Sequence, residues 1–353
     1  MSISNKPLPL TRVVVFFVLF CLSPSFAADT VENADPEYFE LGDFDLGSGE
    51  TIRDCQLAYR TIGTLNHDSS NVVLFPTWFT GHSADIVESG EVGPERMVDS
   101  NNFFVVVVDA LGNGVSCSPS NSKSQAGAAF PAITIQDMVH SQYLLLTKQF
   151  GFSKIKAVVG TSMGGMQAFQ WAVDYPHYME MAIPIESTPI QTSFDLLNWT
   201  TQQRLIDSML ESDHSNSEIM SLITAVEMLT MFTPDFVVRS YAPEAYQEFL
   251  GQWEVHFLSR DVMDFRVQLE AMINHDIYRG HDSSIQDTVS HVKAKILVIV
   301  EREDHQVNPQ PAIEFAGLAK AELHVIAGDC GHLGSAFCYQ AKVKTLVSEF
   351  LAQ

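Results

Sequence analysis

The chain has 353 residues, of which 46% are hydrophobic, so it can bury a large core, and this excludes an intrinsically disordered protein. Its formal net charge of −23 repels phosphates and anionic lipid, which argues against nucleic acid and anionic membrane surfaces as partners. The cysteines are scattered and the histidines are mostly single, without the spacing of a zinc site, so we predict no metal. We also expect no cofactor.

The first segment has the pattern of a secretory signal peptide. Lys6 and Arg12 precede the apolar run 13–22, and small residues stand where a signal peptidase would read them before cutting after Ala27. We therefore expect residues 1–27 to be removed and the mature chain to be periplasmic or secreted. An uncleaved anchor is the alternative, but the run is short for a bilayer and no later stretch of about 20 apolar residues follows, so we expect no stable membrane anchor.

The mature chain keeps an even number of cysteines, which permits disulfides in an oxidising compartment. Three pairings are open, and the one between Cys330 and Cys338 is local. The four residues are Cys55, Cys117, Cys330 and Cys338.

Beyond residue 27, short β-branched runs alternate with longer helical stretches, which predicts an α/β fold with a mostly parallel central sheet and helices on both faces. The run Phe103–Val108 is apolar throughout, as expected of a strand covered on both faces. The expected strands are 57–64, 71–78, 103–110, 154–161, 179–186, 295–302 and 322–327. The helices expected after strands are 134–150, 163–174, 310–319 and 341–351.

Between Ser187 and His291 this alternation stops, and a Met-rich helical stretch takes its place. We interpret it as a helical cap inserted over the sheet, whose methionines fill its core. Helices are expected within it at 217–230, 244–257 and 263–274. The predicted organisation is a signal peptide (1–27), a first core segment (28–186), the cap (187–291) and a second core segment (292–353).

Gly160-Thr-Ser-Met-Gly164 is the clearest local signal for chemistry. It follows the apolar run Ala157–Val159 and precedes the helical stretch 166–172, so Ser162 falls on a tight strand-to-helix turn with its hydroxyl projecting. A glycine-rich turn without chemistry explains such a pattern equally well in isolation. The flanking strand and helix favour a nucleophile.

A serine nucleophile needs a base, and the base needs an acid that holds its tautomer, so an acid and then a histidine are expected in loops after later strands. The loop after the strand 295–302 supplies Asp304, which we choose because it lies beyond the strand and ahead of the turn 307–309. The competing carboxyl groups are Glu301, Glu303 and Asp329.

The loop after the strand 322–327 ends in Gly331-His332, and we choose His332 as the base. His305 adjoins Asp304 and His324 lies inside a strand, so neither is placed to reach across to Ser162. The chain order is then serine, aspartate, histidine.

The oxyanion of such a reaction needs preorganised N–H donors. The backbone N–H of Met163, at the start of the helix, is one candidate. The second is expected in the loop 76–81, where we choose Phe79, with Trp78 as the competitor. Both aromatic side chains are also compatible with lining an acyl pocket.

These residues, with several further stretches, resemble the homoserine O-acetyltransferase group of α/β-hydrolases and its hydrolase-like relatives. The resemblance covers nearly all of the mature chain, and the Ser-Met-Gly-Gly-Met-Gln elbow at 162–167 is typical of the group. The matching stretches are Ala58–Asn66, Trp78–Gly81, Asp109–Gly114, Phe130–Val139, Val158–Gln167, His275–Gly280 and Gly331-His332.

The resemblance implies a ping-pong mechanism under a helical lid, in which the serine takes an acyl group from a thioester and passes it to an alcohol. It further implies that Arg204 binds the substrate carboxylate; an exposed cap-helix arginine is the alternative. Independently of the resemblance, we expect Trp78 to bind substrate as a wall of the acyl pocket. The sequence departs from the group in three places, one of which is the divergent middle of the cap. Thr161 stands where the group usually has glycine, and residues 87–94 replace its Gly-Trp-Trp-Asp segment.

The expected export of the chain helps to rank three hypotheses for its function. Acetyl-CoA and homoserine are cytosolic, so we favour hydrolysis of, or transfer from, a small acyl ester as the reaction of an exported chain. Homoserine O-acetyltransferase-type transfer is the alternative, and a non-catalytic binding module on the same fold is the third. The expected partner is a small acyl substrate, and the sequence leaves a homodimer open.

Overall fold

The computed structural model describes residues 35–279 and 284–353, so the predicted signal peptide (1–27) lies outside the described residues. Residues Asp35–Gln353 form one compact unit. No single described helix has both the length and the apolarity to cross a bilayer, although the bent pair Asn216–Met231 and Pro234–Ser240 passes when its two helices are taken together.

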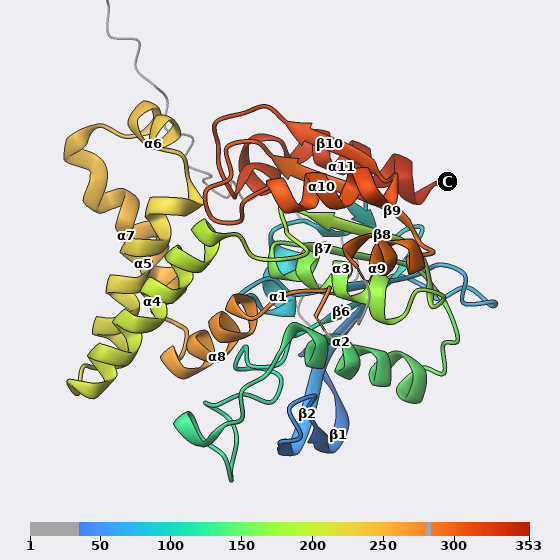
Figure 1. Cartoon of the computed structure of the whole chain (residues 1–353), viewed down its shortest axis with the longest axis horizontal. Helices are drawn as coiled ribbons and strands as arrows, with labels where there is room; N and C mark the ends of the chain where they lie inside the picture. Colours follow the sequence, from blue (N-terminus) through green and yellow to red (C-terminus); the bar gives the residue numbers. More distant parts are fainter. Residues whose placement is uncertain (1–34, 280–283) are drawn as a thin grey trace, which may run out of the picture. The chain divides into compact units, whose positions relative to one another are not determined.

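The centre of the fold is an eight-stranded sheet in the order β1-β2-β6-β3-β7-β8-β9-β10, drawn in Figure 1. β1 pairs antiparallel with β2, β2 pairs antiparallel with β6, and all other neighbours are parallel. The predicted α/β fold with a mostly parallel sheet is therefore confirmed. The strands are β1 (Glu37–Asp45), β2 (Thr51–Ile62), β3 (Val72–Pro76), β6 (Phe104–Val108), β7 (Ile155–Thr161), β8 (Met179–Ile185), β9 (Lys295–Glu301) and β10 (Glu322–Ile326). The short strands β4 (Val92–Gly93) and β5 (Val98–Asp99) form a separate pair.

Two parts of the sheet differ from the sequence-based expectation. β2 begins at Thr51, six residues before the expected start at 57, and β1 was not expected at all. β1 is an edge strand with mostly exposed or half-buried side chains, and its register shifts around Gly42. Such a strand lacks the apolar run that identifies a buried strand, so its sequence carries little signal.

Helices cover both faces of the sheet, because side chains along each strand point alternately to the two sides. Val72 and Leu74 of β3 belong to one core cluster, whereas Val73 and Phe75 belong to the other. The first face is packed by α2 (Ile135–Leu144), α3 (Met163–Asp174), α9 (Ile285–His291) and α10 (Gln310–Ala319). The second is packed by α1 (Ser83–Glu88) and α11 (Gln340–Leu351).

The segment interpreted as a cap contains five consecutive helices that lie together to one side of the sheet (Figure 1). α4 packs against α5 and α8, and α5 packs against α7. α9 lies in the same segment of sequence but packs against α3 and α10, within the layer that covers the sheet. The five helices are α4 (Ser193–Glu211), α5 (Asn216–Met231), α6 (Pro234–Ser240), α7 (Tyr246–Phe257) and α8 (Val262–Ile273).

Two disulfides join the four cysteines. Cys55 of β2 bonds to Cys117 in the loop after β6. Cys330 bonds to Cys338, the local pairing, and so brackets the loop that carries His332.

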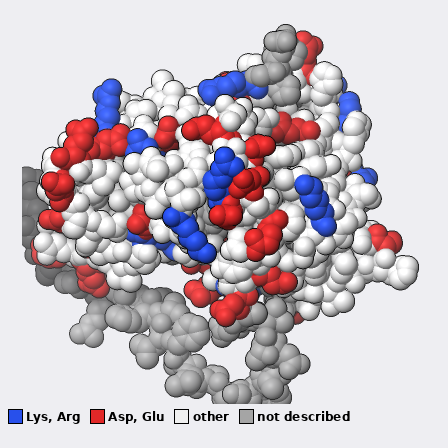
Figure 2. Space-filling view, turned by 90° about the horizontal axis from the view of Figure 1, so that it is seen from below, with Lys and Arg blue, Asp and Glu red and all other residues white. Residues whose placement is uncertain are grey.

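The surface reflects the acidic composition. On the face shown in Figure 2, Asp and Glu side chains are spread over much of the molecule, and Lys and Arg side chains stand singly among them. Among the residues drawn in colour there, no continuous basic area forms on this face.

Candidate active site

Ser162 lies between the end of β7 and the first residue of α3, with φ 57° and ψ −122°. A non-glycine residue in this region is strained, and the surrounding structure must hold it there. The turn is crowded, since a Cβ added to Gly164 would lie 2.6 Å from the carbonyl oxygen of Pro76. Gly164 therefore has to be glycine, and the tight turn presents a half-buried Ser162 at the carboxyl end of the sheet.

The structure brings Ser162, His332 and Asp304 into one hydrogen-bonded chain. Ser162 Oγ lies 2.8 Å from His332 Nε2, and His332 Nδ1 lies 2.7 Å from Asp304 Oδ2. A carboxylate only accepts hydrogen bonds, so Nδ1 carries a proton, and when the imidazole is neutral Nε2 accepts from the serine hydroxyl. This is the arrangement in which an imidazole can remove the proton of a serine nucleophile.

Asp304 is fixed by its own loop, because its Oδ1 accepts hydrogen bonds from the backbone N–H groups of Gln306 and Val307, each at 2.9 Å. The competing carboxyl groups are all directed elsewhere. Glu303 is exposed, Asp329 pairs with Arg239, and Glu301 accepts from the N–H of Gly331. The competing histidines are also placed apart from Ser162. His324 pairs with Glu322, and no bond to Ser162 from His305 is found among the described residues.

Buried carboxyl groups surround His332 and influence the pKa of its imidazole. Burial lowers the pKa of His332, but the charge and hydrogen bond of Asp304, with smaller contributions from Glu186 and Glu227, raise that pKa to about 9. Burial also raises the pKa of Glu186, to about 8, against the opposing charge of His332. The neighbourhood therefore favours the protonated imidazole, which is the form that arises when Ser162 loses its proton.

Two buried carboxyl groups, those of Glu186 and Glu301, hold the loop of His332 in place. Glu186, directly after β8, accepts from the backbone N–H of Ser335 at 2.7 Å and from its hydroxyl. Glu301, at the end of β9, accepts from the N–H of Gly331 at 2.9 Å. A Cβ at Gly334 would collide with the Glu301 carboxylate, so the loop approaches as closely as glycine allows. Sequence reasoning missed Glu186, and its position at the carboxyl end of a strand was the available signal.

Helices of the cap form hydrogen bonds with the loop that carries Asp304. Asp195, in the first turn of α4, accepts from the N–H of Asn308 at 3.0 Å. The side chain of Gln306 donates to Glu227 of α5 at 2.8 Å, and burial raises the pKa of Glu227. Two cap helices thus contact the loop that carries Asp304.

The predicted oxyanion donors have free N–H groups. Among residues 35–279 and 284–353, no acceptor is found for the backbone N–H of Met163, Trp78 or Phe79. Both candidates for the second donor are therefore available, and the structure leaves the choice between Trp78 and Phe79 open. The Phe79 ring faces the cap and lies 4.5 Å from the Phe265 ring of α8, whereas Trp78 packs with the second core cluster and folds over Gly81.

Arg204 lies outside this network. The buried face of α4 is formed by residues at helical spacing, and Arg204, two residues beyond buried Gln202, falls on a different side of the helix and is exposed. No hydrogen bond or ion pair is found for Arg204 within the described part of the chain. The structure thus matches the alternative of an exposed cap-helix arginine, and the role in binding substrate stays a prediction.

Comparisons with known proteins agree with this geometry. A family model described as the alpha/beta hydrolase fold matches residues 71–337. A protein of Corynebacterium glutamicum named "Probable esterase" is 30% identical over 84% of this chain and 89% of its own. The solved structure of an acetylester hydrolase from C. glutamicum has a TM-score of 0.84 and 26% identity, over 93% of this chain and 100% of that one. That of a homoserine O-acetyltransferase from Bacillus anthracis has a TM-score of 0.80 and 25% identity, over 90% and 97%.

Proposed function

The chain belongs to the α/β-hydrolase family, and we propose that it hydrolyses a small acyl ester through an acyl-enzyme on Ser162. The observation that carries this proposal is the continuous hydrogen-bonded chain from Ser162 through His332 to Asp304. Relatives that are esterases or acyltransferases support the general class of acyl chemistry.

In the proposed reaction, His332 Nε2 takes the proton of Ser162 while the serine oxygen attacks the ester carbonyl carbon. The negative oxygen that forms is stabilised by the N–H of Met163 and by that of Phe79 or Trp78. His332 returns its proton to the departing alcohol, which leaves an acyl group on Ser162. A water molecule, deprotonated by the same imidazole, then attacks the acyl carbon and regenerates the serine.

Hydrolysis is favoured over transfer to an amino acid for two reasons. The residue that the family resemblance assigns to the substrate carboxylate, Arg204, is exposed and outside the bonded network. The matched structure with the TM-score of 0.84 is that of an acetylester hydrolase. An acyl-enzyme that meets no second alcohol is hydrolysed by water.

We also propose that the chain acts outside the cytoplasm. The signal-like pattern of residues 1–27 supports export. The disulfides Cys55–Cys117 and Cys330–Cys338 support it independently, because structural disulfides persist in oxidising compartments and are rare in the cytosol.

Homoserine O-acetyltransferase-type transfer is the second candidate, because a solved enzyme of that activity shares the fold at a TM-score of 0.80. The two candidates differ in the acyl donor and the acceptor. Incubation with acetyl-CoA, followed by homoserine, should leave no acetyl group on Ser162 and form no acetylhomoserine if the enzyme is an esterase. Stoichiometric acetylation that homoserine discharges would instead establish the transferase.

The central experiment measures p-nitrophenyl acetate hydrolysis by the purified mature protein. We expect Ser162→Ala and His332→Ala each to lower kcat by about 10³-fold or more, because each removes an essential member of the triad. The matched controls are Ser153→Ala, at an exposed position, and His324→Ala, which is paired with Glu322. A fluorophosphonate probe should label Ser162. A folded protein that it leaves unlabelled would instead support the non-catalytic binding module.

A further inference from the structure

The loop that precedes α1 holds an unusual backbone conformation next to the candidate oxyanion donors. Thr80 has φ 61°, in a region where a β-branched residue is rarely found. Such a conformation persists only where the surrounding structure imposes it. We therefore looked for the contacts that hold residues 77–80, which we name the oxyanion loop.

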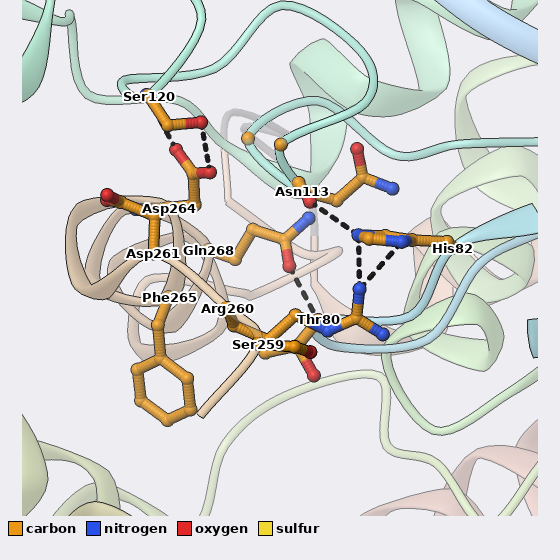
Figure 3. Close-up of a pocket in the computed structure, with 12 residues that line it drawn as sticks. Thr80, His82, Asn113, Ser120, Ser259, Arg260, Asp261, Asp264, Phe265 and Gln268 are labelled. Carbon is orange, nitrogen blue, oxygen red and sulfur yellow. Dashed lines mark hydrogen bonds between the residues drawn. The ribbon is translucent and has the colours of Figure 1, made fainter. Parts of the chain in front are cut away.

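Gln268 of α8 holds one end of this loop. Its Oε1 accepts from the N–H of Thr80 at 2.9 Å, and its Nε2 donates to the carbonyl oxygen of Leu111 at 3.0 Å. The side chain is fully buried. Figure 3 shows Gln268 reaching from the cap helix to Thr80, at the edge of a cavity of about 170 Å³ that also contains Arg260.

Gln167 of α3 holds the other end. Its Nε2 donates to the carbonyl oxygens of Thr77, at 3.1 Å, and Met163, at 3.2 Å. One carboxamide therefore ties the residue that offers the first oxyanion N–H to the loop that offers the second. Gln167 is itself oriented, because its Oε1 accepts from Gln142, whose own oxygen accepts from the indole N–H of Trp171.

The remaining N–H groups of the loop show what these contacts achieve. The N–H of Thr77 donates to the carbonyl oxygen of Val108, and that of Thr80 donates to Gln268. Within the described residues, the N–H groups of Trp78 and Phe79 are left without an acceptor, and these are the two candidates for the second oxyanion donor. The loop is therefore held by hydrogen bonds at both ends, whereas the two N–H groups in its middle remain available to an oxyanion.

We propose that Gln167 and Gln268 are positioning residues that clamp the oxyanion loop from opposite sides, one from the core and one from the cap. This inference rests on the proposed acyl chemistry at Ser162. It assigns the cap a part in forming the oxyanion hole, because α8 carries one of the two carboxamides. Neither glutamine touches the substrate in this role; each acts through the backbone that it holds.

The test compares Gln167→Met and Gln268→Met, which keep the side-chain length and remove the polar contacts. We expect kcat for p-nitrophenyl acetate to fall about 10- to 100-fold with KM nearly unchanged, since a displaced oxyanion donor costs less than a deleted one. Affinity for n-propylboronic acid, whose tetrahedral serine adduct places an oxygen in the oxyanion hole, should fall by a similar factor. Gln170→Met, a buried glutamine of the same helix that bonds to Asp174, is the matched control.

Glutamate variants test the same idea if the methionine variants fail to fold. Gln268 acts on Thr80 as an acceptor, so Gln268→Glu keeps that contact, loses only the bond to Leu111, and should retain more of kcat than Gln268→Met. Gln167 acts on the loop as a donor, so Gln167→Glu loses both contacts and should lose about as much of kcat as Gln167→Met. Equal effects of the two glutamate variants would overturn the clamp.

The outcomes separate this inference from the proposed function. If Ser162→Ala keeps full activity, the proposed function is wrong. If Ser162→Ala is inactive and the glutamine variants match Gln170→Met in kcat and boronic acid affinity, only the clamp is wrong. A loss of thermal stability without loss of boronic acid affinity would show a purely structural role and would also overturn it.

Discussion

Replacing Glu91 by glutamine would remove a buried ionisable group near Ser162, the proposed nucleophile, while keeping the shape of the side chain. Glu91 is buried, and its Oε1 accepts from the hydroxyl of Thr161, the residue before Ser162, at 3.1 Å. Its Oε2 has no partner among the described residues. Burial raises the pKa of Glu91 to about 7, against a smaller opposing effect of the bond from Thr161.

The size of the effect follows from proton linkage. Between its ordinary pKa of 4.5 and about 7, Glu91 holds more protons in the folded state than in the unfolded state. The free energy of unfolding therefore falls as the pH rises through this window. At about 1.4 kcal/mol for each pKa unit, the full cost of ionising Glu91 is on the order of 3 kcal/mol. Most of that cost, roughly 2 to 3 kcal/mol, should develop between about pH 5 and about pH 9.

A glutamine side chain cannot ionise, so the Glu91→Gln variant does not lose this stability as the pH rises. Its free energy of unfolding, relative to that of the unsubstituted protein, should therefore be roughly 2 to 3 kcal/mol higher at about pH 9 than at about pH 5. Urea unfolding of both proteins at both pH values, followed by tryptophan fluorescence, measures the four free energies of unfolding that this comparison needs. The exposed Glu88→Gln variant is the control for the loss of one acidic charge. Parallel pH dependence of Glu91→Gln and the unsubstituted protein would refute the argument that burial holds the proton on Glu91.

Four further predictions concern the candidate catalytic residues and the disulfides. The proposed mechanism needs neutral His332, and the pKa of His332 is raised to about 9. We therefore expect kcat/KM to rise with pH along a limb that lies above 6.5. A pH profile with p-nitrophenyl acetate measures this limb, and a limb at or below 6.5 would contradict the prediction. Asp304→Asn should lower kcat by about 10³- to 10⁴-fold, because the imidazole loses the partner that fixes its tautomer, whereas Glu303→Gln should have little effect in the same assay. Replacing Cys330 and Cys338 by serine should cost about 2 to 3 kcal/mol of stability and also lower kcat, since the loop carries His332. The same change at Cys55 and Cys117 should cost about 4 kcal/mol of stability, because the closed loop is longer, and should leave kcat nearly unchanged. Thermal melts and turnover measured on both variants test this, and a larger loss of kcat at Cys55 and Cys117 than at Cys330 and Cys338 would contradict it.

The sequence identified the features that depend on local patterns. The position of Ser162 follows from a glycine-flanked turn between a strand and a helix, all within about a dozen residues. Asp304 and His332 follow from the rule that functional side chains lie after strands, at the carboxyl edge of a parallel sheet. For Arg204 the spacing of the buried residues of α4 places the side chain on another side of the helix, and its role in binding substrate stays a prediction.

The features that the sequence did not identify depend on contacts between distant segments. Gln167 and Thr77 are 90 residues apart, Gln268 and Thr80 are 188 apart, and Glu186 and Ser335 are 149 apart. A buried glutamine or glutamate in a helix or after a strand has no local pattern that names its partner. Only the fold shows that these side chains hold the loops of the candidate oxyanion donors and of His332.

Two of the three departures from the family pattern are in contact in the structure. Thr161 replaces the usual glycine of the elbow, and Glu91 lies in the segment 87–94 that replaces another family motif. The hydroxyl of one donates to the carboxylate of the other, and both side chains are buried. A threonine hydroxyl in a buried site needs a partner, and a buried carboxylate needs a donor, so each change satisfies a requirement that the other creates. It follows that the two positions should be substituted together: Thr161→Gly alone leaves the Glu91 carboxyl group without its donor, whereas combining Thr161→Gly with Glu91→Gln also removes the ionisable group that required it.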